Sequence, residues 1–200
     1  MRTVTTAAGI DASAGINAAA GRGEGQLDMD RIELESKQFL TEMCFGCGVN
    51  NHNGLHGRFY NTKDGKSVAL FQAGDAFQSY PDRLHGGITA AMLDEALGRS
   101  ILAVEPYCWA VTVELNVRYI KPVPLNSPLK IMSEVTENNR RIFRCAGSLV
   151  LSDGEIAATA TGTYMKQRLE KIANLEGGEF VNPCLEQELD IEHITVVQKG

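Results

Sequence analysis

The sequence predicts an α+β fold in which a curved antiparallel sheet of about five to six strands wraps one long helix. Three observations carry this prediction. One strong helical segment is expected from Ile88 to Val104, four strand-like segments follow it, and short turns separate those segments. In the last segment Ala158, Ala160 and Gly162 fall on one side, and such small residues let the backbone of a helix come close to a sheet.

Each element is expected from its own local pattern. Residues 32–43 are consistent with a short helix, and strand-like stretches follow at residues 55–60 and 67–72. After the long helix, strands are expected at residues 108–120, 127–136, 141–151 and 155–165. The intervening sequences "KPVPLN", "ENN" and "SDGE" are rich in turn-forming residues, and the last two are short enough for hairpins.

Period-2 alternation is clearest in the strand directly after the helix. The apolar side of that alternation comprises Val111, Val113, Leu115, Val117 and Tyr119. The polar side comprises Thr112, Glu114, Asn116 and Arg118. We therefore expect the apolar face of this strand to be buried, with Thr112 on the opposite face.

A chain of 200 residues is long enough for one domain with tails. Residues 1–32 are rich in Ala and Gly and offer little bulky apolar surface, so we expect them to be disordered. An overlong start site and a transit peptide are alternatives for this segment, although Arg2 and Arg22 are its only basic residues before Arg31. Residues 33–168 are the expected domain. Residues 169–200 form an acidic C-terminal extension that either adds a strand or packs across the surface.

The composition excludes several classes of protein. With 44% hydrophobic residues, 22% charged residues and a net charge of -6, the chain has neither a long apolar run for a membrane span nor a basic surface for nucleic acid. Five cysteines is an odd number, and the N-terminal segment has no secretory pattern. We therefore expect free thiols and a cytoplasmic location.

Two neighbouring acids in the long helix are expected to differ. Glu95 can pair with Arg99 one turn later, which is typical of a surface acid. On a helical period, Asp94 instead shares its face with small or apolar residues, namely Ala90, Ala91, Leu97, Gly98 and Ile101. A carboxylate in such surroundings is desolvated and becomes a better proton acceptor. Asp94 is therefore the candidate catalytic acid, against the alternative of an ordinary solvated acid.

Gly86 and Gly87 stand where the long helix is expected to begin. The first backbone N–H groups of a helix have no partner within it, and without Cβ atoms they are open to a ligand, so they suit a developing oxyanion. The alternative for a glycine pair is a simple turn or cap. Gly86 and Asp94 are eight residues apart, or roughly 12 Å along one helix, which is too far to act on one carbonyl. We therefore expect a homodimer with two shared active sites.

Several motifs occur in the order found in one known family. They are "CFGCG", "LHGG" with an acid nine residues after the histidine, "TVELNVRYIKPVPL" and a final "GTY". Over residues 42–167 the chain resembles the hotdog-fold acyl-CoA thioesterases of the phenylacetate-degradation (PaaI-like) and human thioesterase-superfamily type. This resemblance implies a helix wrapped by a sheet, edge-to-edge dimers that often pair into tetramers, and hydrolysis of a CoA thioester to free acid and CoA.

The resemblance also implies roles for individual residues. Asp94 matches the acid that acts as general base on water or as nucleophile, and the Gly86 amide matches the donor that polarises the thioester carbonyl. His85 matches the residue that shapes this turn, with Gly87 beside the substrate. Thr112 matches a hydroxyl that positions the water or the acid, and its expected polar face agrees with that role.

Further residues are expected to contact substrate. Some relatives have Asn six residues before the histidine, whereas this chain has Ser79 there, beside Gln78, and either side chain can hydrogen-bond the thioester region. Basic residues that can bind the phosphates of CoA are Lys121, Lys130, Arg140, Arg141 and Arg144, with a solvated sheet edge as the alternative. The proposed hydrolysis requires neither a cofactor nor a metal.

Three alternatives remain open at this stage. The spacing of Cys44, Cys47, His52 and His56 can in principle wrap one zinc ion, although His56 is expected to head a strand. A non-catalytic acyl-CoA-binding or regulatory protein is a second option, because fold does not dictate function. A hotdog hydratase or dehydratase is a third, but the histidine and acid motifs of those sites are absent. The sequence does not define the acyl group.

Overall fold

The computed structural model describes residues 28–173, 175–176, 179–180 and 185–198. Most of the segment expected to be disordered, residues 1–27, therefore lies outside the described residues. The strand Asp28–Lys37 runs across the expected domain boundary at residue 32, and the strand Ile156–Lys166 ends two residues before the expected boundary at residue 168.

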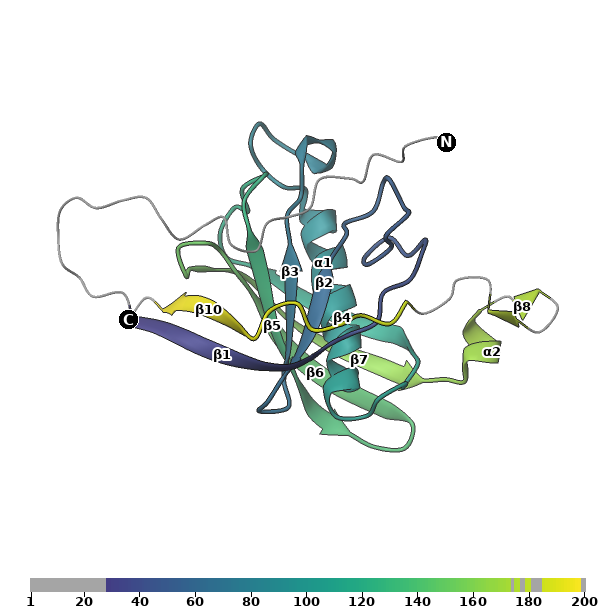
Figure 1. Ribbon diagram of the computed structural model, residues 1–200. Coiled ribbons are helices and arrows are strands. Elements are labelled where there is room, and N and C mark those ends of the chain that lie inside the picture. The colour runs from purple at the N-terminus through teal and green to yellow at the C-terminus, as the bar shows by residue number, and fades with distance from the viewer. Residues whose placement is uncertain (1–27, 174, 177–178, 181–184, 199–200) are drawn as a thin grey trace, which may run out of the picture.

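One long helix, α1 (Gly86–Arg99), lies against an antiparallel sheet that the described residues form with eight strands (Figure 1). The strand order is β10-β1-β2-β3-β5-β6-β7-β4, so β4 and β10 are the two edges. The expected architecture is confirmed, with more strands than the five to six predicted. The strands are β1 (Asp28–Lys37), β2 (Arg58–Thr62), β3 (Ser67–Phe71), β4 (Ala110–Tyr119), β5 (Leu129–Asn138), β6 (Ile142–Val150), β7 (Ile156–Lys166) and β10 (His193–Gln198).

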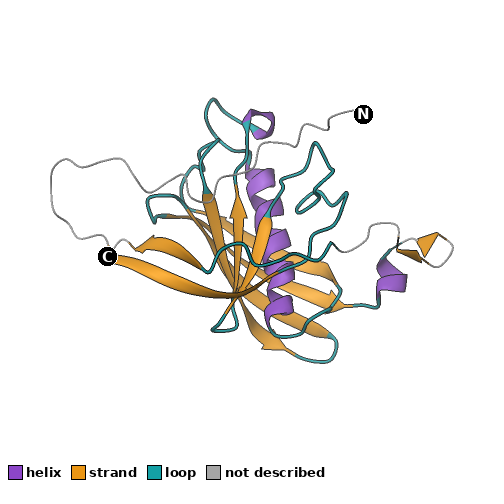
Figure 2. Cartoon of the chain, viewed as in Figure 1, coloured by secondary structure: helices purple, strands orange, loops and turns teal. Residues whose placement is uncertain are grey.

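Figure 2 shows the helix held in the curve of the sheet, with short elements around it. The single helix expected to reach Val104 is divided into two elements. The α-helix α1 ends at Arg99, and a 3-10 helix, η2 (Ser100–Ala103), follows it directly. The other short elements are η1 (Asp75–Phe77), α2 (Leu169–Ile172), β8 (Leu175–Glu176) and β9 (Glu179–Phe180).

Small residues on the sheet allow α1 to pack closely, as the sequence predicts. Ala158 and Ala160 of β7 are buried, and so are Leu93 and Leu97 of α1. At Gly147 of β6 an added Cβ would lie 2.8 Å from a methyl carbon of Leu97, closer than real Cβ contacts. The helix can therefore approach this strand only where the strand has no side chain.

The short helix expected at residues 32–43 is wrong, because this stretch begins as strand β1. β1 pairs with β2 on one side and with β10, from the C-terminal extension, on the other. Leu34 of β1 and Ile194 of β10 are both buried. The extension thus adds a strand, one of its two predicted outcomes. Its pairing with β1 joins residues 160 to 170 positions apart, from Glu33 with His193 to Asp28 with Gln198, and a local pattern cannot reveal such a pairing.

A β-bulge in β4 overturns the predicted division of its faces. The register with β7 shifts between Thr112 and Glu114, so Val113 is the extra residue, and its side chain is 60% exposed. Past a bulge the alternation of side chains restarts. Thr112 therefore lies on the same face as Tyr119, toward α1, although simple alternation assigns them to opposite faces.

None of the helices in the described part of the chain combines the length and the apolar character needed to cross a membrane.

Candidate active site

A pocket of about 310 Å³ lies between α1, the edge of β4, the end of β7 and the loop after β1. Asp94, Thr112 and Tyr164 meet on one side of it, and Glu95 with Arg99 lies on another. The remaining wall is mostly apolar and is formed by Phe39, Thr41, Cys44, Cys47, Gly98, Leu102, Cys108, Trp109 and Ala110. A carboxylate thus stands at the edge of an apolar cavity of the size that small organic groups occupy.

Two hydroxyl groups hold the Asp94 carboxylate. The Thr112 hydroxyl donates to it at 3.0 Å from Oδ1 and 3.3 Å from Oδ2. The Tyr164 hydroxyl lies 3.0 Å from Oδ1 and 3.0 Å from the Asp94 carbonyl oxygen. The structure therefore brings together Asp94 and Thr112, as predicted, and the bulge at Val113 is what turns Thr112 toward the acid.

Sequence reasoning missed Tyr164. Its ring stacks on Phe143 at 5.0 Å between centroids, which fixes the direction of the hydroxyl. Burial, together with the Asp94 charge, raises the pKa of Tyr164 well above its usual range, so the hydroxyl keeps its proton and donates. The signal was present in the sequence, because Tyr164 continues the alternation of Ala160 and Gly162 on the face toward α1.

The glycine pair forms the first turn of α1, with His85 as the N-cap. The Nδ1 atom of His85 accepts the Gly87 N–H at 3.0 Å, and its carbonyl oxygen accepts the N–H groups of Ile88 and Thr89, both at 3.0 Å. His85 thus shapes the turn, as the resemblance implies, and of the first four N–H groups only that of Gly86 is not bonded to it. The Gly86 carbonyl accepts from the Tyr119 hydroxyl at 2.9 Å.

Gly86 and Asp94 lie eight residues apart on one continuous helix, so their separation is roughly 12 Å, as predicted. The structure does not bring them together within one chain. The two residues also contact opposite ends of β4. The Asp94 carboxylate accepts a hydrogen bond from Thr112, near the start of the strand, and the Gly86 carbonyl accepts one from Tyr119, at its end.

Gln78 and Ser79 lie in the exposed loop that leads into α1. The Gln78 side-chain oxygen accepts from the Asp82 N–H at 3.2 Å, and the Ser79 N–H donates to the Arg83 carbonyl at 2.8 Å. The same loop meets the helix start, because the His85 N–H donates to Phe77 at 2.9 Å. Both residues are thus near the Gly86 end of the site, away from Asp94.

The predicted basic residues do not form one cluster within the chain. Lys121 follows β4 at the Tyr119 end and pairs with Glu155 at 2.6 Å. Arg140 and Arg141 lie in the turn between β5 and β6, where the Arg141 carbonyl accepts from Lys166 N–H at the Ala110 end of β4. About 30 Å of strand separates the two groups. Of the other two, Arg144 pairs with Glu137, and burial lowers the pKa of Lys130.

Glu95 is not the ordinary surface acid that the sequence suggests. Its predicted pair with Arg99 is confirmed, with Nε and Oε1 3.2 Å apart. The loop after β1 covers the carboxylate so closely that a Cβ at Gly46 would lie 2.6 Å from it. This burial raises the pKa of Glu95 to about 7, although Arg99 opposes the shift. Glu95 is therefore a desolvated acid beside Asp94.

The four-residue zinc site considered from the sequence does not form. His52 and His56 are exposed, and neither joins Cys44 and Cys47. Among the described residues, the one group of three metal-ligating side chains is Cys44, Cys47 and Glu95, whose ligand atoms lie within 4.8 Å of one another. The Arg99 guanidinium contacts the Cys47 sulfur at 3.5 Å, which places a positive charge where a cation would bind.

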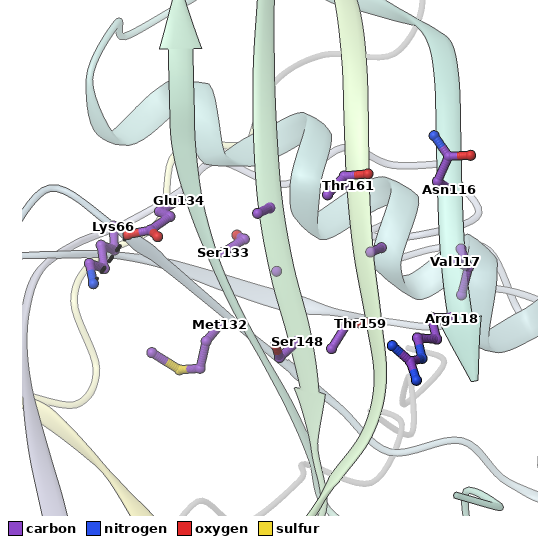
Figure 3. Close-up of a pocket in the computed structure, with 13 residues that line it drawn as sticks. Lys66, Asn116, Val117, Arg118, Met132, Ser133, Glu134, Ser148, Thr159 and Thr161 are labelled. Atoms are coloured by element: carbon purple, nitrogen blue, oxygen red, sulfur yellow. Dashed lines mark ion pairs between the residues drawn. The ribbon is translucent and has the colours of Figure 1, made fainter. Parts of the chain in front are cut away.

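A larger hollow of about 600 Å³ lies on the face of the sheet turned away from α1 (Figure 3). The polar side chains in its lining include Asn116, Arg118, Glu134, Ser148, Thr159 and Thr161. Asp94 and the start of α1 take no part in it. The smaller pocket at Asp94 is therefore the candidate active site.

Comparison with known proteins supports the fold and shows what the chain is similar to. Residues 82–158, which include α1 and most of the sheet that follows it, match the family model described as Thioesterase superfamily. These residues are thus similar to the thioesterase superfamily. The solved structure of a phenylacetic acid degradation-related protein from Ralstonia eutropha JMP134 is 27% identical, with a TM-score of 0.51, covering 56% of this chain and 85% of that one. The hotdog fold is thereby confirmed.

Two curated relatives of the superfamily are named acyl-coenzyme A thioesterase THEM4. The protein from Bos taurus is 32% identical over 114 residues, 56% of this chain and 46% of the relative. The protein from Xenopus laevis is 31% identical over 110 residues, 54% of this chain and 48% of the relative. The chain thus spans about half the length of these thioesterase relatives.

Proposed function

We propose that this protein hydrolyses acyl-CoA thioesters, with Asp94 of one protomer and the Gly86 N–H of the other acting on one carbonyl. This proposal rests above all on the Asp94 carboxylate, which accepts hydrogen bonds from Thr112 and Tyr164 at the edge of an apolar pocket. The match of residues 82–158 to the Thioesterase superfamily model and the similarity to curated acyl-coenzyme A thioesterases support the substrate class.

The edge strand β4 supports a shared site. Edge strands present unpaired N–H and C=O groups, and β4 also exposes Val113 and Tyr119. If two β4 strands pair antiparallel about a twofold axis between Leu115 and Asn116, Thr112 of one chain lies opposite the partner's Tyr119. Because Thr112 holds Asp94 and Tyr119 holds Gly86, the acid of one chain then faces the partner's Gly86.

The same twofold axis brings Lys121 of one chain close to the Arg140–Arg141 turn of the other. Lys121 lies beyond the Tyr119 end of β4, and the Arg140–Arg141 turn lies beyond the Ala110 end. In the antiparallel pair, Lys121 therefore comes to the end that holds Arg141 of the partner subunit. Positive charge from both chains then lies where the phosphates of CoA can bind. Two such dimers can pair into a tetramer, and we expect the reaction in the cytoplasm.

The chemistry follows from these positions. The Gly86 N–H, at the positive end of the α1 dipole, stabilises the oxyanion that forms on the thioester carbonyl. As general base, Asp94 takes a proton from the attacking water; as nucleophile, it attacks the carbonyl itself, and both routes use the same orientation. The C–S bond then breaks, and the CoA thiolate leaves and takes up a proton. On the nucleophile route, water then hydrolyses the anhydride formed between Asp94 and the acyl group, which releases the free acid and restores the carboxylate.

The test is release of free thiol from a panel of aryl, medium-chain and long-chain acyl-CoAs. We expect wild-type turnover and a loss of at least about 100-fold in Asp94→Asn. Glu134→Gln, on the outer face of the sheet, is the matched control and should keep full activity. Binding of acyl-CoA without turnover would support the non-catalytic alternative, and loss of an enoyl-CoA double bond without thiol release would support a hydratase.

A further inference from the structure

Two cysteine thiols lie together on the wall of the Asp94 pocket, on the turn "CFGCG". The Gly48 N–H donates to the Cys44 carbonyl at 2.8 Å, and the Gly46 N–H donates to the Cys44 sulfur at 3.3 Å. A Cβ at Gly48 would lie 2.3 Å from the Cys44 carbonyl oxygen, so only glycine permits this turn. The turn brings both sulfur atoms to within 4.8 Å of each other.

The two thiols have opposite electrostatic surroundings. The Cys47 sulfur lies 3.5 Å from Arg99 Nη2 and 3.5 Å from the Thr41 hydroxyl. The Cys44 sulfur instead faces the Glu95 carboxylate, 3.8 Å from each of its oxygens. A cation therefore stabilises negative charge on one sulfur, and a carboxylate is placed to take a proton from the other.

The direction of the pKa shifts agrees with this arrangement. A hydrogen bond from Cys44, together with Arg99, lowers the pKa of Cys47. The same hydrogen bond, burial and the Glu95 charge raise the pKa of Cys44. Of the two thiols, Cys47 is therefore the one that loses its proton more readily, and Cys44 is the one that keeps it.

We propose that Cys44 and Cys47 form a dithiol site that reacts with a small hydroperoxide and closes to a disulfide. The Cys47 thiol first loses its proton to solvent, and the thiolate attacks one oxygen of hydrogen peroxide, so that an S–O bond forms and the O–O bond breaks. The departing hydroxide takes a proton back from solvent to become water. The Cys44 sulfur then attacks the Cys47 sulfur, an S–S bond forms and the S–O bond breaks. Overall, two thiols are oxidised, one peroxide is reduced and two waters leave.

Glu95 completes the second step. It accepts the proton of Cys44 as that sulfur attacks, and it returns the proton to the hydroxide that leaves Cys47. A pKa near neutrality suits a group that must both take and give a proton. Cys47 is only 2% exposed, but it lines the pocket, and a peroxide is little larger than the water molecules that enter such cavities.

Cys108 provides an internal comparison, because it lines the same pocket and has Glu105 as well as Lys166 beside it. Burial raises the pKa of Cys108. Full-length protein treated with hydrogen peroxide should form a Cys44–Cys47 disulfide, detected by peptide mapping. Cys44→Ser should accumulate sulfenic acid on Cys47, trapped with dimedone, at least about tenfold faster than on Cys108.

Glu95→Gln should slow disulfide closure by at least about tenfold while Cys47 is still oxidised. Cys108→Ser should leave closure unchanged, and Cys44→Ala provides a second trapping variant if Cys44→Ser does not fold. The proposal is overturned if Cys47 is oxidised no faster than Cys108, if no disulfide joins residues 44 and 47, or if the purified chain holds stoichiometric zinc that Cys47→Ser removes. These readouts do not involve thioester hydrolysis, so the function proposed above stands or falls separately.

Discussion

The Tyr164 hydroxyl donates a hydrogen bond to the Asp94 carboxylate at 3.0 Å, across 70 residues of sequence. Its ring is fixed by stacking on Phe143, so the hydroxyl reaches the acid from a rigid strand rather than from a loop. A reacting carboxylate held by packed side chains keeps its orientation through turnover. Tyr164 is thus a positioning residue for Asp94.

Tyr164→Phe removes the hydroxyl and keeps the stacked ring. We expect kcat for acyl-CoA hydrolysis to fall by about tenfold with little change in KM, because orientation of the acid is lost and the pocket is retained. Tyr80→Phe, at an exposed tyrosine, is the control and should match wild type. Equal loss of kcat and of folding stability in Tyr164→Phe would instead indicate a purely structural role.

The second hydroxyl, that of Thr112, is tested by a pair of variants. Thr112→Ala should lower kcat by about tenfold, whereas Thr112→Ser keeps the donor at Asp94 and should recover most of the rate. Thr159→Ala, on the outer face of the sheet, serves as the comparison and should not change the rate. A Ser variant as slow as the Ala variant would show that the methyl group, not the hydroxyl, matters.

Thr112 shows how far sequence reasoning reaches. The residue and its partner were predicted, but the face assigned to it was wrong, because a bulge restarts the alternation at Val113. Bulges depend on how two strands pair, and a single strand's pattern does not contain that information. The prediction for the long helix was more successful because its pattern is local and strongly periodic.

Glu95 shows a second limit. The helical period shows only which residues of α1 share a face of the helix. From that pattern alone, Glu95 and Arg99 are expected to form an ordinary ion pair on the protein surface. The loop after β1 covers this face of the helix, as the close approach of Gly46 shows, and a contact between segments 49 residues apart leaves no local signal. The strand β1 itself was mistaken for a helix for the same reason, since its partner β10 comes from the other end of the chain.

Burial of Glu95 predicts a pH dependence of stability. Its folded pKa, about 7, exceeds the ordinary value of 4.5, so between these values the folded state binds more protons than the unfolded state. The free energy of unfolding attributable to Glu95 therefore falls as pH rises from about 4.5 to 7 and then levels off. The charged and titratable groups around this carboxylate must be kept in the variant that is compared with wild type; they are Arg99, Cys44, Cys47 and Asp94.

Glu95→Gln is that variant. Urea unfolding of both proteins at several pH values should show the Gln variant gaining stability relative to wild type as pH rises through this window, by about 3 kcal/mol at most. Glu134→Gln, at an exposed acid of β5, is measured alongside as the comparison for removal of a surface carboxylate. A constant difference between Glu95→Gln and wild type would contradict the raised pKa.

The basic turn predicts a split between substrates. If Arg140 and Arg141 bind the phosphates of CoA, Arg141→Ala should raise KM for an acyl-CoA by about tenfold, with little effect on the matching acyl-pantetheine, which lacks the adenosine phosphates. Arg31→Ala, at an exposed arginine of β1, is the control. Equal effects on both substrates would place the phosphates elsewhere.

The shared site makes a sharper prediction, because two inactive variants should restore each other. Gly86→Pro removes the N–H that is proposed to bind the oxyanion. Proline is tolerated at the first position of a helix, and His85 already has the extended conformation, with φ -65° and ψ 134°, that a residue before proline requires. A side chain at Gly86 also meets only ordinary contacts with the Tyr119 ring, at 3.7 Å or more.

Gly86→Pro and Asp94→Asn homodimers should both be nearly inactive. When the two chains are unfolded together and refolded, half of the dimers are mixed, and each mixed dimer has one site with an intact Asp94 facing an intact Gly86. Activity should therefore return to about a quarter of the wild-type value. If each site instead used Asp94 and Gly86 of the same chain, the mixture would stay as inactive as its parents.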